Sequence, residues 1–224
     1  SQVQRVAPPL EVVGGNMWEN RDIYANIPGN PVLPFSHVNG ATAYAQENGK
    51  DIVYIGATLG YGTDMEIFRY VVNDINDPTA DTCEWVGLYW SRTGGQGAGA
   101  YDPGQKVFLA LGDRSVPFWY HDLNTPGPNN KDVGVVPTDP GAAFDTALAS
   151  NAIGNFGMDF DPVRRRYVLW GGGGAVWTLA PPATVTPTGW TISKQPVPTS
   201  AIPSAIVANG VLGKWKYIPN LDAF

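Results

Sequence analysis

One turn motif recurs along this chain at almost constant spacing, and it constrains the fold more than any other feature. An aromatic residue marks each copy: Tyr44, Tyr101, Phe160 and Tyr217. The intervals are 57, 59 and 57 residues, and three such similar intervals indicate an internal repeat. The second and third markers are followed by Asp-Pro, which starts a tight turn between two strands.

Each repeat contains four short strand-like segments arranged around its turn. A segment rich in small residues precedes the turn, and an apolar run ending in glycine and two further segments follow it. The segments are Gly40–Tyr44, Ile52–Ile55, Glu66–Val71 and Glu84–Trp90, then Gly97–Tyr101, Val107–Leu111, Pro117–Leu123 and Asp132–Val136, then Gly154–Phe160, Tyr167–Trp170, Ala175–Leu179 and Gly189–Ser193. A fourth repeat begins with a predicted strand at Gly213–Tyr217. No stretch shows helical periodicity.

Four short antiparallel strands at a fixed period predict an all-β fold, and more specifically a β-propeller built from four-stranded blades. The repeats cover about residues 37–94, 95–150, 151–207 and, in part, 208–224. Residues 1–36 are rich in proline and are expected to be irregular, with short strands. Because four repeats are few for a closed ring, we expect the propeller to be incomplete in this chain.

The repeats resemble the kelch type of propeller, the class that includes the central domain of galactose oxidase. The third repeat carries this resemblance best: Gly171-Gly172 ends a strand, Trp177 lies in the next strand and Trp190 opens the last one. The first and second repeats match this pattern in part. The resemblance implies the fold and leaves the function open, because this architecture carries enzymes, adaptors and lectins.

The composition argues against several classes of partner. The formal net charge is −6 and the isoelectric point is near 4.8, which disfavours nucleic acid and anionic membranes. No apolar run reaches the roughly 18 residues that a membrane-spanning helix needs. Cys83 is the single cysteine, so no intrachain disulfide can form. Few lysines and many Trp, Asn, Gly and Thr residues favour a secreted bacterial or viral protein, so we expect an extracellular or cell-surface location.

Loops at one end of the predicted strands are the expected ligand-binding face. Antiparallel connection places the turns between first and second strands, and between third and fourth strands, at one end, and the remaining loops at the other. These remaining loops are the longer and more varied ones, and binding residues are common in such loops. We predict that the ligand contacts come from His37, Asn39, Tyr61, Asp64, Arg92, Asp113 and Arg114. Each of them taken alone is also explained as a solvated loop residue.

Calcium is the one cofactor that the sequence suggests. Asp74, Asp77 and Asp81 fall within eight residues, and hard cations take oxygen ligands from such loops. The same residues commonly form turns, so the alternative is a protein without a cofactor. A copper site is not expected, because His37 and His121 would lie at opposite ends of the strands.

Two further clusters have plain explanations. Asp159 and Asp161 flank Phe160 on one strand face and could form a catalytic carboxylate pair, but the turn already explains Asp161. Arg164–Arg166 and Gly171–Gly174 do not form a phosphate-binding loop, since a strand and not a helix follows the glycines. We expect the three arginines at a solvent-exposed hairpin.

The function that the sequence favours is recognition, by a secreted or surface-exposed domain that binds a glycan or a protein. The second hypothesis is a polysaccharide-active enzyme on the same scaffold, which requires carboxylates such as Asp64 and Asp113 to meet near the axis. The third hypothesis is a structural subunit of a larger extracellular or viral assembly. It requires a buried interface well above about 1,000 Å².

Overall fold

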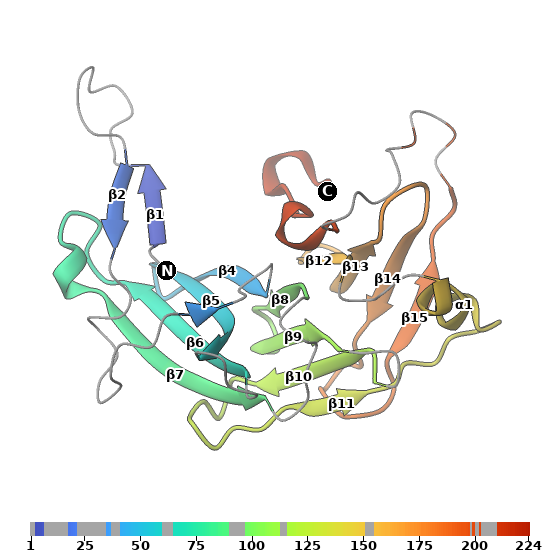
Figure 1. Ribbon diagram of the computed structural model, residues 1–224, viewed down its shortest axis with the longest axis horizontal. Coiled ribbons are helices and arrows are strands. Elements are labelled where there is room, and N and C mark those ends of the chain that lie inside the picture. Colours follow the sequence, from blue (N-terminus) through green and yellow to red (C-terminus); the bar gives the residue numbers. More distant parts are fainter. Residues whose placement is uncertain are drawn as a thin grey trace.

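The computed structural model describes most of the chain from residue 41 onward, together with three strands before it (Figure 1). The described parts are Val3–Val6, Trp18–Arg21 and Phe35–Ser36, and residues 41–59, 65–89, 97–112, 116–150, 155–197, 199, 202 and 210–224. Antiparallel strands dominate them, so the prediction of an all-β fold is confirmed.

Three antiparallel sheets follow one another along the chain, and each has the four consecutive strands predicted for its repeat. The first contains β4 (Thr42–Glu47), β5 (Lys50–Leu59), β6 (Met65–Val72) and β7 (Thr82–Tyr89), with β3 (Phe35–Ser36) paired to the end of β5. The second contains β8 (Gly99–Asp102), β9 (Val107–Leu111), β10 (Phe118–Asp122) and β11 (Val133–Val135). The third contains β12 (Gly157–Asp161), β13 (Arg166–Trp170), β14 (Val176–Ala180) and β15 (Thr191–Lys194). A separate ladder joins β1 (Val3–Val6) to β2 (Trp18–Arg21).

The first strands of the three sheets lie side by side in the middle of the molecule. β8 contacts β4 on one side and β12 on the other, while β7, β11 and β15 lie at the periphery (Figure 1). Small side chains permit this close approach, and Ala43, Ala45 and Ala100 are buried there. Gly99 has no room for a side chain, because a Cβ atom would lie 2.5 Å from the ring of Phe108.

The larger core lies between the second and third sheets. Alternate residues of β9 point into it, as the two-residue period of a strand requires. Its bulk comes from buried aromatic side chains, among them Phe118, Phe144, Tyr167, Trp177 and Trp190. The ring centroids of Phe144 and Trp177 are 5.2 Å apart in an edge-on arrangement, which is a favourable geometry for aromatic pairs.

A short helix supplies one of these core residues. α1 (Ala143–Ser150) carries Phe144, and no helical periodicity marks it in the sequence. The carboxylate of Asp139 stabilises its start, because Oδ2 accepts hydrogen bonds from the backbone N–H groups of Phe144 and Asp145, at 2.8 and 3.1 Å. Eight residues are too few to show a helical period in the sequence. No helix in the described ranges is long and apolar enough to cross a membrane.

The smaller core joins the first and second sheets and contains a buried tyrosine pair. The ring centroids of Tyr54 and Tyr101 are 4.5 Å apart. Both hydroxyl groups donate hydrogen bonds to the carboxylate of Glu47 at the end of β4, that of Tyr54 at 3.0 Å. Burial is the main reason why the pKa of Tyr54 is raised to about 12, and it raises the pKa of Tyr101 as well.

The outer strand of the second sheet connects the three sheets at their periphery. Just before β11, the backbone N–H of Leu88 in β7 donates to the carbonyl of Asn130 at 2.8 Å. Just after β11, the N–H of Thr138 donates to the carbonyl of Trp190 at 2.9 Å, and the N–H of Ile192 donates to the carbonyl of Thr138 at 3.0 Å. Residues 130–138 thus form backbone hydrogen bonds with all three sheets.

The Asp-Pro turn has the same structure in the second and third sheets. Asp102 Oδ1 accepts hydrogen bonds from the backbone N–H groups two and three residues later, at 2.8 and 3.2 Å. Asp161 Oδ1 does the same at 3.1 and 3.0 Å. Each turn ends on a residue in the left-handed region, Lys106 with a φ of 54° and Arg165 with a φ of 51°. The aspartates therefore act as turn formers, as predicted.

The C-terminal segment, residues 210–224, contains a further copy of this turn. Ile218 pairs with Ala223 in an isolated bridge, and Asp222 between them has a φ of 47°. The bridge and the residue with positive φ lie as many residues after Tyr217 as the corresponding pair and residue of the two Asp-Pro turns lie after Tyr101 and Phe160. The 3-10 turn η4 (Pro219–Leu221) forms its tip.

Two details of the predicted repeat are wrong. The strand expected at Gly213–Tyr217 is absent from the described segment, where the 3-10 turn η3 (Leu212–Lys214) packs against β12 instead. The first marker also differs, because the hairpin of β4 and β5 turns at Asn48-Gly49 with positive φ at both residues. Tyr44 consequently lies farther from its turn than Tyr101 does, and it is 64% exposed where Tyr101 is 4% exposed.

Candidate functional site

The predicted ligand-binding face lies outside the described residues. All seven of its residues are affected, namely His37, Asn39, Tyr61, Asp64, Arg92, Asp113 and Arg114. Their placement therefore stays a prediction. The described residues enclose a cavity at the other end of the strands, where the Asp-Pro turns lie.

The three aspartates predicted as calcium ligands lie between β6 and β7, and each is engaged locally. Asp74 Oδ1 and Asp77 Oδ1 both accept a hydrogen bond from the backbone N–H two residues later, at 2.8 and 2.9 Å. Asp81 is 2% exposed and accepts a hydrogen bond from the Asn73 backbone at 3.0 Å. Within the described ranges, no three His, Cys, Asp or Glu side chains gather closely enough to hold a metal ion. Calcium binding stays a prediction that these contacts do not support.

His121 and Cys83 are both buried in the fold. Burial lowers the pKa of His121 to about 4, so its ring is neutral at pH 7, and Nε2 lies 3.2 Å from the carbonyl oxygen of Leu88. Burial also raises the pKa of the Cys83 thiol to about 12, which keeps it protonated and unreactive. Both residues thus belong to the packed interior of the first two sheets.

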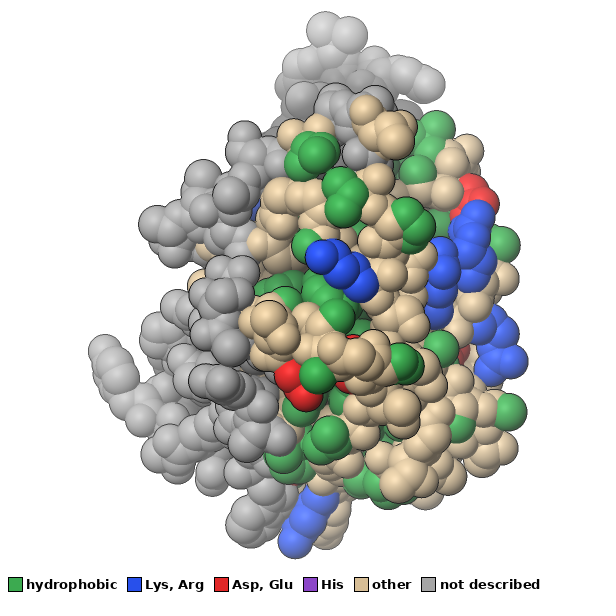
Figure 2. Space-filling view, turned by 90° about the vertical axis from the view of Figure 1, so that its right-hand side faces the viewer, with side chains coloured by type: hydrophobic (Ala, Val, Ile, Leu, Met, Phe, Trp, Pro, Cys, Tyr) green, Lys and Arg blue, Asp and Glu red, His purple; other side chains and the backbone are tan. Residues whose placement is uncertain are grey.

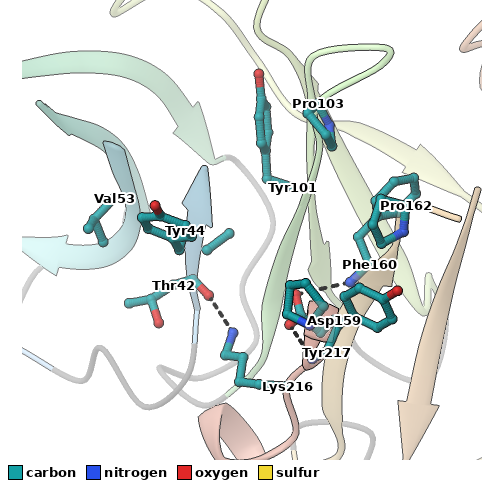
Figure 3. A pocket seen from close by; sticks show the side chains of 12 residues that line it. Thr42, Tyr44, Val53, Tyr101, Pro103, Asp159, Phe160, Pro162, Lys216 and Tyr217 are labelled. Carbon is teal, nitrogen blue, oxygen red and sulfur yellow. Dashed lines mark hydrogen bonds between the residues drawn. The ribbon is translucent and has the colours of Figure 1, made fainter. Parts of the chain in front are cut away.

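A cavity of about 410 Å³, here called the central cavity, lies between the innermost strands and the C-terminal segment (Figure 3). Its walls come from all three sheets. The lining residues are Thr42, Ala43, Tyr44, Val53, Tyr101, Pro103, Asp159, Phe160, Pro162, Lys216, Tyr217 and Pro219. A cavity of this size, mostly apolar with a few polar groups, is typical of small-molecule sites.

Aromatic and proline side chains form most of the wall. Tyr44 is the exposed aromatic on the β4 side, and its hydroxyl donates a hydrogen bond of 2.6 Å to Asp51 Oδ1. That hydrogen bond is the main reason why the pKa of Tyr44 is raised to about 12. The hydrogen bond therefore holds the ring in place. Tyr217 lies on the opposite side, in the C-terminal segment (Figure 3).

One carboxylate and one ammonium group line the cavity among the described residues. Asp159 Oδ1 accepts a hydrogen bond from the backbone of Phe160 at 3.0 Å, and Oδ2 accepts one from the backbone of Tyr217 at 2.9 Å. Burial raises the pKa of Asp159, and the positive charge of Lys216 opposes this shift. Lys216 Nζ donates a hydrogen bond of 3.1 Å to the carbonyl of Thr42, so it connects the C-terminal segment to the first sheet (Figure 3).

The suggested carboxylate pair does not form in this cavity. Asp159 lines it, but Asp161 is 1% exposed and its Oδ2 lies 3.2 Å from Arg164 NH1 and 3.4 Å from Arg166 Nε. Hydrolysis of a glycosidic bond by the usual route needs two carboxyl groups that face the same bond. Among the described lining residues Asp159 is the one acid, so this arrangement supports binding better than hydrolysis.

Signals for this cavity in the sequence are weak. The spacing of the aromatic markers predicts turns, and all four markers also line the cavity. Lys216 carries no motif, and its position depends on how the C-terminal segment folds. No protein-family model, curated protein or solved structure matches this chain. The kelch resemblance therefore remains a prediction.

Proposed function

We propose that this chain is a recognition domain whose central cavity binds a glycan, on a scaffold of kelch-like propeller blades. The three sheets are then successive blades, and the cavity lies at their shared axis. Two observations support the scaffold: the innermost strands lie side by side, and the turn after them recurs. An extracellular or cell-surface location, as expected from the composition, is part of the same proposal.

The observation that carries the proposal is the pairing of one exposed aromatic ring, that of Tyr44, with a few fixed polar groups in one cavity. The ring of Tyr44 offers a flat apolar surface to the C–H face of a sugar. The carboxylate of Asp159 can accept, and the ammonium group of Lys216 can donate, further hydrogen bonds to sugar hydroxyl groups. Because these two groups carry opposite charges, an uncharged sugar is the favoured ligand.

The predicted loop face, with residues such as His37 and Arg114, remains a second candidate surface for a protein or glycan ligand. The enzyme hypothesis has less support, because Asp159 has no second carboxylate beside it among the described lining residues. The hypothesis of a structural subunit in a larger assembly stays open as a prediction about oligomeric state.

A glycan array followed by calorimetric titration tests this proposal. We expect Tyr44→Ala to weaken binding of a neutral sugar at least about tenfold, since one aromatic contact is lost. Tyr44→Phe keeps the ring and should bind within a few-fold of the wild type. Val136→Ser, at an exposed position next to the peripheral strand β11, is the control for a general surface effect. The proposal fails if no sugar binds, or if Tyr44→Ala binds as tightly as the wild type.

A further inference from the structure

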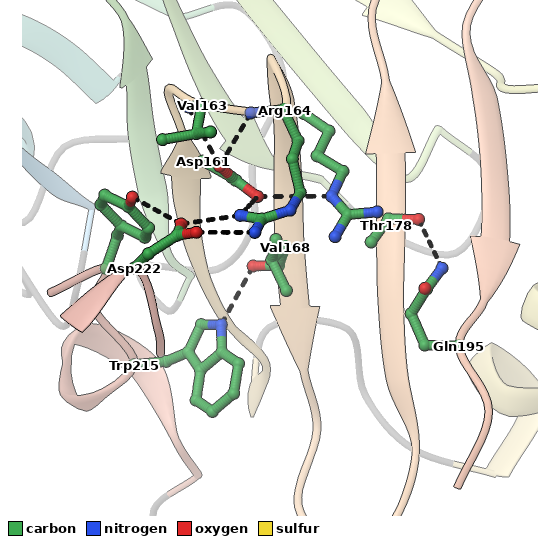
Figure 4. A network of polar contacts seen from close by, with 10 residues as sticks. Asp161, Val163, Arg164, Val168, Thr178, Gln195, Trp215 and Asp222 are labelled. Atoms are coloured by element: carbon green, nitrogen blue, oxygen red, sulfur yellow. Dashed lines mark hydrogen bonds and ion pairs between the residues drawn. The ribbon is translucent and has the colours of Figure 1, made fainter. Parts of the chain in front are cut away.

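A second cavity of about 340 Å³, here called the lateral cavity, lies on the face of the third sheet that points away from the second sheet (Figure 4). The C-terminal segment forms one of its walls. The lining residues are Asp161, Arg164, Arg166, Val168, Val176, Thr178, Gln195, Trp215, Asp222 and Phe224. The glycan proposal concerns the central cavity alone and assigns no function to the lateral cavity.

Two arginines line the lateral cavity, and they differ in how fully they are engaged. Arg164 donates to Asp161 at 3.2 Å and to both oxygens of Asp222 at 2.7 Å (Figure 4). Arg166 forms an ion pair with Asp161, in which Nε lies 3.4 Å from Oδ2 and is too poorly placed to form a hydrogen bond. The two terminal nitrogens of Arg166 have no hydrogen-bond acceptor among the described residues.

Asp161 cannot supply the missing acceptors. Its Oδ1 already accepts two backbone N–H groups, and its Oδ2 faces both arginines. A carboxylate offers about four lone-pair directions; three of them accept hydrogen bonds, and Arg166 Nε lies beside the fourth, which leaves little capacity for the terminal nitrogens. The fixed fork of an arginine matches a second carboxylate well, because two parallel N–H groups bind two oxygens at once.

The remaining polar groups of the cavity also favour a ligand that accepts hydrogen bonds. Gln195 Nε2 donates to Thr178 Oγ1 at 2.8 Å, so the hydroxyl proton of Thr178 is directed elsewhere and is available to a ligand (Figure 4). Thr178 itself is 7% exposed, which fixes its position. The rings of Trp215 and Phe224 stack at 5.2 Å between centroids and form an apolar wall beside these donors.

We propose that the lateral cavity binds a carboxylate attached to a ring. The carboxylate pairs with the terminal nitrogens of Arg166 and accepts the Thr178 hydroxyl, while the ring packs against Trp215 and Phe224. A sugar acid and an aromatic acid share this chemistry. The site is separate from the central cavity, so it does not depend on the glycan proposal.

Calorimetric titration with glucuronate and with benzoate tests this site, with glucose and benzamide as their uncharged counterparts; it is carried out on the Tyr44→Ala variant, so that sugar binding in the central cavity does not contribute. We expect at least one of the two acids to bind at least about tenfold more tightly than its uncharged counterpart. Preference for glucuronate identifies a sugar acid as the source of the carboxylate, and preference for benzoate identifies an aromatic acid. Equal binding of acids and uncharged counterparts, or no binding of either acid, overturns the proposal.

Two variants test whether the side chains of Arg166 and Thr178 donate hydrogen bonds to the bound acid. Arg166→Gln should weaken binding of the acid at least about tenfold, and Thr178→Val, which keeps the shape and removes the hydroxyl group, should weaken it several-fold. Arg165→Gln is the matched control, because Arg165 is exposed in the same turn and does not line the cavity. Thermal unfolding of each variant shows that it is folded. Wild-type affinity in both Arg166→Gln and Thr178→Val would also overturn the assignment, and Tyr44→Ala should leave acid binding unchanged.

Discussion

Arg164 donates two hydrogen bonds of 2.7 Å to the two carboxylate oxygens of Asp222, which lies 58 residues later in the chain. Through Asp161, the same guanidinium is connected to the turn between β12 and β13. Trp215 adds a second anchor, since its indole N–H donates to the carbonyl of Val168 at 3.1 Å. These contacts hold the C-terminal segment on the third sheet, and that segment supplies a wall of both cavities.

The attachment of the C-terminal segment should weaken in acid. Hydrogen bonds from Arg164, and then from Tyr217, lower the pKa of Asp222 to about 2, below the value of about 3.9 for a free aspartate. A lowered pKa means that the stabilisation is complete above about pH 4 and is lost as the pH falls through about 2. We expect the indole N–H resonance of Trp215 to lose its hydrogen-bonded position over that interval.

Asp222→Asn is the matched variant for this titration. It keeps the shape of the side chain but removes the charge, so we expect its Trp215 resonance to be independent of pH between about 4 and 2. At pH 7 the variant should also show faster proteolysis within residues 210–224 than the wild type. An unchanged Trp215 resonance in the wild type down to pH 2 would rule out this role for Asp222.

Gly157 is expected to be essential for the same attachment. A Cβ atom at this position would lie 2.4 Å from Trp215 Cβ, 2.7 Å from Val211 Cγ1 and 2.8 Å from the carbonyl oxygen of Leu212. We predict that Gly157→Ala destabilises the fold by about 1–3 kcal/mol, because the C-terminal segment has to move. Gly104→Ala is the control, since a Cβ atom there meets one carboxylate oxygen at 3.2 Å. Urea denaturation of both variants measures the difference, and equal stabilities would contradict the prediction.

The sequence predicted the repeated part of the fold better than the parts where chain segments meet. Period-two patterns and glycine-terminated runs locate the strands of the three sheets, because these signals are local. The marker spacing also located the turn near Tyr217, although no strand precedes it in the described segment. The segment forms η3 because Trp215, Tyr217 and Asp222 find partners on the third sheet, and such partners cannot be read from local propensity.

The cavities were harder to predict than the strands. Asp159 and Asp161 look equivalent in the sequence, two residues apart on one strand face. Asp159 lines the central cavity because Tyr217 and Lys216 lie beside it. Asp161 instead forms an ion pair with Arg164 and lines the lateral cavity. Contacts more than fifty residues apart decide these roles, and a single sequence contains no direct signal for them.

Helix α1 should contribute to stability through one side chain. Phe144 is 1% exposed, and its ring centroid lies 5.7 Å from that of Phe118 and 5.2 Å from that of Trp177. We predict that Phe144→Ala lowers the free energy of unfolding by about 3–5 kcal/mol, because it leaves a cavity between the second and third sheets. Phe144→Leu fills most of that space and should cost clearly less. Thermal and urea unfolding compare the two, and a loss below about 1 kcal/mol for Phe144→Ala would contradict the role of the helix.

The tyrosine pair between the first and second sheets should make the protein sensitive to alkaline pH. Tyr54 and Tyr101 both have raised pKa values, that of Tyr54 about 12, while an unfolded tyrosine titrates near about 10. The native state therefore keeps protons that the unfolded state releases, so stability is complete below about pH 10 and falls as the pH rises towards 12. Urea unfolding between pH 8 and 12 measures this loss.

The double variant Tyr54→Phe, Tyr101→Phe separates this pair from the other tyrosines. It removes both titrating hydroxyl groups, so its stability should fall less steeply above pH 10 than that of the wild type. At neutral pH the variant is expected to be less stable, because Glu47 loses two hydrogen-bond donors and remains partly buried. Ultraviolet absorbance of native wild-type protein at pH 11 should show at least two tyrosines that remain protonated. If all tyrosines ionise there while the protein is still folded, the buried pair does not hold its protons and the alkaline loss has another origin.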